Sequence, residues 1–319
     1  MCANALTAQK QKFSVAITTE GYKNLINNTL GDPERSRRFV TAITSAVAVN
    51  PALQECTPGT ILAGALLGES LNLSPSPQLG QYYLVPFKQR VKDKEGKVIW
   101  VTDEQGNKVK DKNGKYIAVT EDRAVFVLGY KGYIQLAIRS GQYRDIDVME
   151  IKKGEYHGKD PATGKPLFYF VADDDEREAL PTEGYLAYFE YLNGFRKSLY
   201  WSKTKMMNHA DQYSAAFSAK DYVKLQKGEI PPEDMWKYSS YWYTDFDGMA
   251  KKTMIRQLIS RWGIMSIEMQ QGFVSDSKFI QVENGSFVET DADIPEAPVE
   301  QPPEAPVETT EQTVNLKDL

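Results

Sequence analysis

Three closely related turn sequences between residues 90 and 120 constrain the fold of this chain more than any other feature. They read DKEGK from Asp93, DEQGN from Asp103 and DKNGK from Asp111, and β-rich segments such as VIWV and YIAV flank them. In each turn a glycine follows polar residues and can supply the positive φ that a tight reversal needs. The pattern predicts successive hairpins, which we expect to form a β-hairpin excursion over about residues 88–122.

Helical patterns precede this β-rich region and predict an N-terminal helical lobe. Residues 34–49, ERSRRFVTAITSAVAV, have the spacing of a helix. The segment TPGTILAGALLGESLNL begins a second helix, with Thr57 as N-cap and Pro58 at the first helical position. LGQYYLVPF then reads as a strand. Residues 1–30 are expected to be a flexible N-terminal segment and residues 31–275 a single folded domain.

The stretch GYKGYIQLAIRSGQY, residues 129–143, combines cationic and aromatic side chains without a carboxylate. AVFVLGY reads as a strand, two glycines interrupt it, and YIQLAIRS continues with helical spacing. Because DIDVMEI follows as an alternating strand, we expect an α+β fold in which this helix is held by a central antiparallel-rich sheet with flanking helices. Tyr130, Lys131 and Tyr133 would then cluster at a strand-to-helix turn, where helix amide groups can also meet a phosphate.

Two later segments add basic and aromatic residues. GYLAYFEYLNGFRKSLYWSKTKM reads as a hairpin with an Asn-Gly turn, which delivers Trp201 and Lys203 to the start of the next helix. In DFDGMAKKTMIRQLISRWGIM, Lys252 and Arg256 lie one turn apart beside an apolar arc, so this helix is expected to pack with one side and offer charge with the other. Lys251 falls within the arc, and it either snorkels at the helix edge or is buried for a purpose.

Charge is unevenly distributed along the chain. Residues 276–319 contain 11 acidic and 2 basic residues, a net charge of −9, which leaves +4 for residues 1–275. The acidic segment repeats PEAPVE and is nearly free of aromatic residues. Such a composition cannot bury enough apolar area to offset chain entropy, so we expect a disordered acidic Pro/Glu-rich tail and a body that ends near Val274.

Basic residues in the body gather in stretches that lack acidic ones, namely residues 123–143, 196–209 and 251–263, and each stretch carries Tyr or Trp. Positive charge follows a phosphate backbone, and exposed aromatic rings stack on unpaired bases, so the combination favours single-stranded nucleic acid. From Lys88 to Lys115 there are 9 basic and 5 acidic residues. This excursion either reaches along a nucleic acid or is a solubilised surface feature.

Other chemistries find little support in the sequence. Cys2 and Cys56 are too few for a disulfide framework and fit a cytoplasmic location, and neither a leader nor an apolar run of membrane-spanning length is present. GKDPATGKP departs from the spacing of a phosphate-binding loop and is interpreted as a turn. Two alternatives stay open: a metal-dependent nuclease that uses the carboxylates of residues 173–176, and a structural phage protein whose basic stretches bind acidic partners.

FVLGYKGYIQLAIRSGQY, NGFRKSLYW and DGMAKKTMIRQLISRWGIMSIEM, in this order, resemble the signature segments of the RecT family of phage single-strand annealing recombinases. The resemblance implies a protein that is not an enzyme, oligomerises as a ring or helical filament, and pairs complementary strands without ATP. It implies single-stranded DNA and the annealed duplex intermediate as ligands, and a phage exonuclease and the host single-strand binding protein as partners. No cofactor is expected to be required, with Mg²⁺ assisting annealing only through the DNA.

The resemblance also implies where DNA is bound, in a groove built around the GYKGY turn. The expected DNA-binding residues are Tyr130, Lys131, Tyr133, Arg139, Gln142, Trp201, Lys203, Lys251, Lys252 and Arg256. No catalytic or metal-binding residue is expected. The excursion at residues 88–122 is longer than in many members, so family contacts are not transferred to it.

Overall fold

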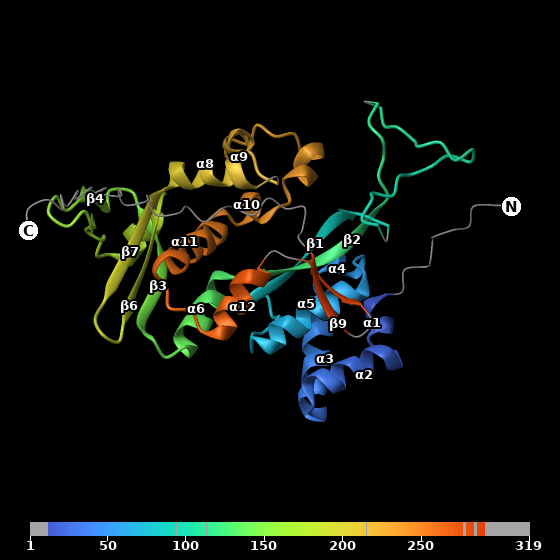
Figure 1. Ribbon diagram of the computed structural model, residues 1–319. Coiled ribbons are helices and arrows are strands. Elements are labelled where there is room, and N and C mark those ends of the chain that lie inside the picture. Colours follow the sequence, from blue (N-terminus) through green and yellow to red (C-terminus); the bar gives the residue numbers. More distant parts are fainter. Residues whose placement is uncertain are drawn as a thin grey trace, which may run out of the picture.

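The computed structural model describes residues 12–93, 95–112, 114–214, 216–276, 279–283 and 286–290, the last two ranges as backbone. The fold is α+β with antiparallel sheets, as the sequence predicts. A helical lobe at the N-terminus, a long β-ribbon and a three-stranded sheet follow one another along the molecule, and the helix α11 runs between the sheet and the ribbon (Figure 1).

The N-terminal lobe begins earlier than the sequence predicts. Its helices are α1 (Phe13–Ala16), α2 (Glu20–Leu30), α3 (Pro33–Ala48), α4 (Pro51–Gln54) and α5 (Pro58–Ser70). Phe13 and Ile26 are buried in the core, so the prediction of a flexible segment up to residue 30 is wrong for the residues from 12 onward. Residues 1–11 lie outside the described part of the chain. The sequence feature that indicates these first two helices is the helical spacing of the apolar residues in α1 and α2.

A two-stranded antiparallel ribbon packs directly on α5. It consists of β1 (Tyr82–Arg90) and β2 (Thr120–Leu128), with Tyr82 opposite Leu128 and Arg90 opposite Thr120. The helix approaches closely because two of its residues are glycines. A Cβ at Gly64 would lie 2.7 Å from the Leu84 side chain, and one at Gly68 would lie 2.4 Å from the Tyr82 ring.

Beyond β1 and β2 the ribbon branches into three short arms, which project away from the rest of the molecule (Figure 1). The bridges Lys92–Val98, Thr102–Lys108 and Lys110–Tyr116 each close one arm. Gly96, Gly106 and Gly114 have φ values of 79°, 84° and 78°, which L-residues with a side chain rarely adopt. The predicted succession of hairpins at residues 88–122 is therefore confirmed.

A second sheet of three antiparallel strands has the order β3-β6-β7, with β3 at Tyr143–Lys152, β6 at Thr182–Tyr191 and β7 at Arg196–Ser202. The helix α6 (Tyr130–Arg139) connects β2 to β3. Its two flanking strands belong to different sheets, so α6 links the sheets instead of lying within one. A small arm of β4 (Tyr156–Lys159), β5 (Pro166–Phe168) and α7 (Asp174–Ala179) lies between β3 and β6 in the sequence.

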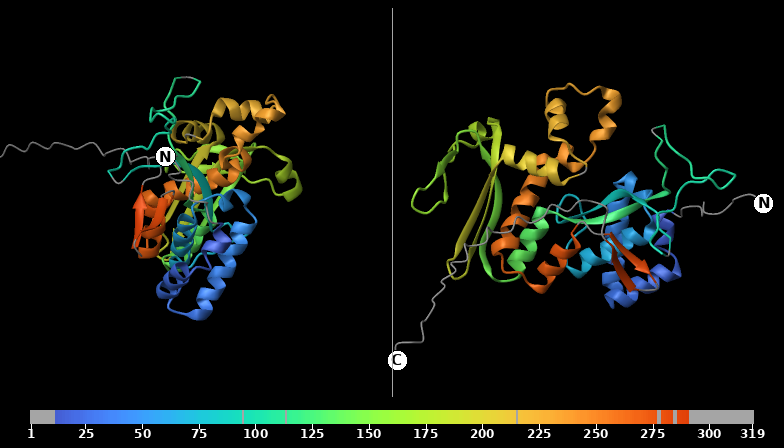
Figure 2. Two further views of the ribbon diagram at one scale, coloured as in Figure 1. Left: turned by 90° about the vertical axis from the view of Figure 1, so that its right-hand side faces the viewer. Right: turned by 45° about the horizontal axis from the view of Figure 1, so that its top comes forward.

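The C-terminal helices cover the sheet and complete the core. They are α8 (Lys203–Tyr213), α9 (Ala219–Gln226), the 3₁₀ helix η1 (Pro232–Tyr238), α10 (Tyr241–Thr244), α11 (Phe246–Trp262) and α12 (Ile267–Ser275). Met254, Ile255, Leu258 and Ile259 on α11 are fully buried, as the helical period predicts. Figure 2 shows α8 and α9 standing on the same side of the molecule as the branched ribbon.

The folded body extends past the predicted boundary at residue 275. Asp276 is fully buried, and the strands β8 (Phe279–Glu283) and β9 (Ser286–Thr290) pair as a hairpin, with β8 lying against α5 and β2. The prediction of a disordered tail from residue 276 is therefore wrong for Asp276 and for the two strands. The PEAPVE repeats lie outside the described residues.

Candidate nucleic-acid interface

The strand-to-helix turn at the start of α6 is fixed by close backbone packing. Gly129 is the N-cap of α6, and its amide donates to the Gln81 carbonyl at 2.8 Å. A Cβ at Gly132 would lie 2.1 Å from the same carbonyl oxygen, so a glycine is required there. This contact places the first turn of α6, with Tyr130 and Lys131, against the start of β1.

Lys131 is exposed and lies beside Tyr83 of β1. A Cβ at Gly80 would be 3.4 Å from the Lys131 side chain and 3.1 Å from the Tyr83 hydroxyl, so both side chains flank this glycine. The Tyr83 ring lies 5.8 Å from the ring of Tyr241 on α10. Burial, followed by the neighbouring Tyr241, Asp245 and Tyr130, raises the pKa of Tyr83 above its ordinary value.

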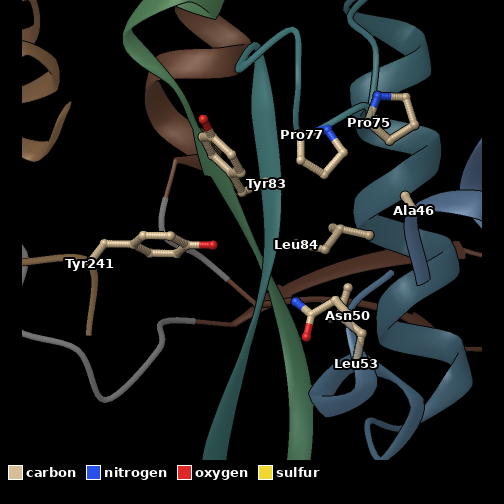
Figure 3. A pocket seen from close by; sticks show the side chains of 8 residues that line it. All are labelled: Ala46, Asn50, Leu53, Pro75, Pro77, Tyr83, Leu84 and Tyr241. Carbon is tan, nitrogen blue, oxygen red and sulfur yellow. The ribbon is translucent and has the colours of Figure 1, made fainter. Parts of the chain in front are cut away.

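Tyr83 and Tyr241 also line a small pocket together with residues of the N-terminal lobe (Figure 3). The side chain of Tyr241 extends toward β1, and Pro75 and Pro77 lie on the other side of that strand from it. The remaining lining residues come from α3, α4, β1 and the turn between them: Ala46, Asn50, Leu53 and Leu84. The partly exposed rings of Tyr83 and Tyr241 therefore lie at this pocket, and the exposed Lys131 lies beside Tyr83.

Lys251 approaches the same region from α11. Its Nζ lies 5.9 Å from the Tyr130 ring centroid and pairs with Glu150 Oε1 at 2.8 Å. Lys152 Nζ donates to the other Glu150 oxygen at 3.0 Å. Burial alone would raise the pKa of Glu150, but the hydrogen bonds from the two lysines lower it to about 2. Lys251 is thus partly buried and ion-paired with Glu150. Of the two expectations, snorkelling at the helix edge or burial for a purpose, the structure supports the second.

Lys203 begins α8, and its Nζ lies 5.7 Å from the Phe246 ring at the start of α11. The residue before Phe246 is Asp245, whose charge contributes to the raised pKa of Tyr241 after the larger effect of burial. Six residues from five elements thus gather around the N-terminal end of α11. We call them the Tyr–Lys surface: Tyr83, Tyr130, Lys131, Lys203, Tyr241 and Lys251.

Lys252 and Arg256 do not face outward, contrary to the prediction from the helical period. Lys252 Nζ pairs with Asp276 Oδ1 at 2.9 Å, and Arg256 Nη1 with Asp276 Oδ2 at 3.3 Å. Tyr133 is also fully buried, and its hydroxyl donates to Asp276 Oδ2 at 3.0 Å. We call these four residues the Asp276 network. Their burial against one another corrects the expectation that Tyr133, Lys252 and Arg256 form walls of an open groove.

Three other predicted residues also lie away from the Tyr–Lys surface. Trp201 is 2% exposed and packs in the core, with Lys205 Nζ 4.3 Å above its ring, so its ring is not a platform for stacking bases. Arg139 is at the opposite end of α6 from Lys131, where its Nη1 donates to the Leu71 carbonyl at 3.0 Å. Gln142 follows that end, and its carbonyl accepts from the Leu192 amide at 3.2 Å.

The structure adds two aromatic residues that the sequence reading missed. Tyr83 lies in LGQYYLVPF and Tyr241 in SSYWYTDF, and neither segment carries a lysine or arginine. The search for aromatic residues inside basic stretches therefore could not find them. The available signal was the strand period, which puts Tyr82 and Tyr83 on opposite faces of β1 and leaves one of them outside the core.

The described residues hold no group of three or more His, Cys, Asp and Glu side chains that could bind a metal ion. The carboxylates at residues 173–176 are exposed, and the Asp173 side chain caps α7 by accepting from the Glu176 amide at 2.8 Å. The segment from Gly158 is a turn, as predicted, in which Asp160 Oδ1 accepts from the Thr163 amide at 2.7 Å. In the part of the chain that is described, no helix has the length and apolar character needed to cross a membrane.

Comparison with known proteins agrees with the resemblance seen in the sequence. A model described as the RecT family matches residues 37–289. The chain is 30% identical over 245 residues to the uncharacterized protein YqaK of Bacillus subtilis (strain 168), which covers 77% of this chain and 66% of YqaK. It is 24% identical over 243 residues to the protein RecT of Escherichia coli (strain K12), which covers 76% of this chain and 72% of RecT.

The matched region includes every residue of the Tyr–Lys surface and of the Asp276 network. It also includes β8 and nearly all of β9, in agreement with a folded body that continues past residue 275. The chain spans about two thirds of the length of YqaK. This chain therefore belongs to the RecT family.

Proposed function

We propose that this protein binds single-stranded DNA on the Tyr–Lys surface and anneals complementary strands during homologous recombination. The observation that carries the proposal is the position of exposed Lys131 beside the half-exposed rings of Tyr83 and Tyr241, within the region matched by the family model. Ammonium groups neutralise phosphates, and phenol rings stack on bases without regard to sequence. Unpaired strands present both groups, whereas a duplex hides its bases.

The proposed mechanism has no covalent step and needs neither ATP nor a cofactor, with Mg²⁺ acting only on the DNA. Lys131 and Lys203 hold the backbone of one strand, and the tyrosines support its bases while their pairing edges stay open. A second strand then samples registers until pairing and stacking make its release slow. Pairing supplies the specificity, and the protein supplies local concentration and reduces repulsion between the strands.

From its membership of the RecT family we also propose that the protein assembles into oligomers and acts together with partner proteins. Protomers side by side in a ring or helical filament would join their surfaces into one continuous DNA path. The partners proposed are a phage exonuclease, which exposes the strand, and the host single-strand binding protein, which covers it, both in the bacterial cytoplasm.

Fluorescence anisotropy with a labelled dT oligonucleotide, without ATP, tests the proposal, together with annealing of complementary and non-complementary pairs. The change Lys131→Gln should weaken binding several-fold and make the slope of log affinity against log salt less steep by about 0.7. The matched control is Lys23→Gln, which removes an exposed lysine of α2 that pairs with Glu20.

The results separate the candidate functions. Equal binding by wild type and Lys131→Gln would remove the Tyr–Lys surface from the proposal, and failure of the wild type to bind or anneal would remove the function itself. Magnesium-dependent loss of the labelled strand would favour the nuclease alternative. A salt slope near zero would favour a protein that uses its basic stretches to bind acidic partners.

A further inference from the structure

The branch point between the second and third arms of the ribbon carries a cluster of two aromatic rings and two lysines, of which Tyr116, Lys108 and Lys110 are exposed and Trp100 is partly exposed. The rings of Trp100 and Tyr116 meet edge to face at 5.8 Å. Lys108 Nζ lies 5.4 Å from the Trp100 ring and 5.7 Å from the Tyr116 ring, and Lys110 Nζ lies 5.0 Å from the Tyr116 ring. We call these four residues the ribbon cluster. Tyr116 is 49% exposed and is not part of the hydrophobic core.

Backbone hydrogen bonds hold the cluster in place. At one junction the amides of Val101, Val109 and Ile117 form a closed ring: Val101 donates to Ile117, Ile117 to Val109 and Val109 to Val101, at 2.8 to 2.9 Å. Each member of the cluster is the neighbour in sequence of one of these three residues. Aromatic side chains that are ordered before binding lose less entropy when a ligand stacks on them.

The aspartates that begin the arms accept hydrogen bonds from backbone amides of their own turns. Asp103 Oδ1 accepts from the amides of Gln105 and Asn107 at 3.0 and 2.8 Å, and Asp93 caps the first arm in the same way. Within the described residues, neither Lys108 nor Lys110 is ion-paired with a carboxylate. The cluster therefore offers positive charge and ring surface together.

The ribbon cluster also lies on the continuation of the strand that carries Tyr83. From Tyr83 to Arg90, β1 extends for about 23 Å at roughly 3.3 Å per residue. Lys88 and Arg90 are exposed along this stretch, just before the arms begin. By the two-residue period of a strand these two cations lie on the face opposite Tyr83, so β1 connects the Tyr–Lys surface to the arms through its backbone and not through a continuous basic face.

We propose that the ribbon cluster is a second contact for single-stranded DNA, outside the Tyr–Lys surface, and that it engages strands too long for that surface alone. This inference rests on the proposed function, because it names a further part of the same ligand. Charge and exposed rings together favour a polynucleotide over an acidic protein, since an acidic protein would need the lysines but not the stacked rings. Lys108 and Lys110 would meet phosphates, and Trp100 or Tyr116 a base.

Anisotropy with two dT oligonucleotides tests this, one of about 8 nucleotides, within the range of a single binding site, and one about five times longer. The variants are Trp100→Leu/Tyr116→Leu and Lys108→Gln/Lys110→Gln. The matched control Lys112→Gln/Lys115→Gln removes the same charge from the tip of the same arm, from lysines that, among the described residues, are not in the cation–ring contacts of the cluster. Because none of the substituted residues is buried, the thermal unfolding midpoint should not change in any of the variants.

The aromatic variant should bind the long strand at least about fivefold more weakly and the short strand normally. The Lys108→Gln/Lys110→Gln variant should make the salt slope for the long strand less steep by about 1.4, and the control should not. Unchanged long-strand binding, or equal losses in cluster and control variants, would overturn the inference while leaving the proposed function intact. Loss of self-association without DNA would identify a contact between protomers and also overturn it. Failure of the wild type to bind either strand would remove the proposed function itself.

Discussion

Replacing Asp276 by alanine tests whether one buried carboxylate holds the C-terminal end of the fold. The side chain is fully buried and accepts from the Leu128 amide at 2.8 Å, the Tyr133 hydroxyl at 3.0 Å, Lys252 at 2.9 Å and Arg256 at 3.3 Å. The two cationic side chains are only 10% and 15% exposed, so water cannot replace the lost carboxylate well.

The expected cost follows from these contacts. Removing one partner of a buried ion pair costs about 3–5 kcal/mol, because a charge stays behind in a medium that solvates it poorly. The whole free energy of unfolding of a domain is only about 5–15 kcal/mol, so Asp276→Ala should consume a large share of it. A chain truncated after Ser275 should lose stability by at least as much, since it lacks the same carboxylate.

Urea unfolding followed by tryptophan fluorescence measures the effect as a lower midpoint with an unchanged m-value. Asp234→Ala is the matched control, because Asp234 pairs with Lys237 at 2.6 Å with side chains 41% and 48% exposed and should cost less than about 1 kcal/mol. The combined change Lys252→Met/Arg256→Met/Asp276→Asn should recover much of the loss, because it leaves no buried charge and the asparagine carbonyl can still accept from the Leu128 amide or the Tyr133 hydroxyl. A cost for Asp276→Ala no greater than that of the control would refute the reasoning.

Two further predictions concern the supports of the Tyr–Lys surface. The lowered pKa of Glu150 contributes stability above pH 4.5 that disappears as the pH falls toward 2, by about 3 kcal/mol at most. Urea unfolding across this range should show a smaller loss in Glu150→Gln than in wild type, the remainder coming from carboxylates such as Glu155 and Glu190, whose pKa values are also lowered. Gly132→Ala should lower stability by about 1–3 kcal/mol, because its Cβ meets the Gln81 carbonyl, whereas Gly21→Ala, in open space on α2, should be neutral or stabilising. Equal unfolding midpoints for the two glycine variants would contradict the packing argument.

Local patterns in the sequence predicted most of the elements. Thr57 and Pro58 start a helix where expected, and the three Asp–Gly turns form three arms. The apolar period of α11 places its core residues correctly. These features depend on residues near one another in the chain, so the sequence contains what is needed to predict them. The sheet partners of β2 and β3 depend on distant segments, and this is where the prediction of one sheet around α6 differs from the structure.

The two ends of the folded domain were harder to predict, because the composition of a segment averages over residues with different roles. The acidic count placed Asp276 in the tail with ten other carboxylates, yet this one residue is buried and paired. At the other end, α1 and α2 follow directly on a segment that lies outside the described residues, and only their few apolar positions mark them as part of the lobe.

The sequence by itself determined the family, the α+β class, the branched ribbon and the presence of stretches in which cations and rings occur without carboxylates. Only the tertiary structure decided which of those cations face solvent. Glu150 comes to Lys251 from another strand, Asp276 comes to Lys252 and Arg256 from beyond α12, and Lys131 keeps an exposed position beside two tyrosines. The reason is physical: a charge is neutralised by whatever lies within a few ångströms in space, and the fold sets those neighbours without regard to their separation along the chain.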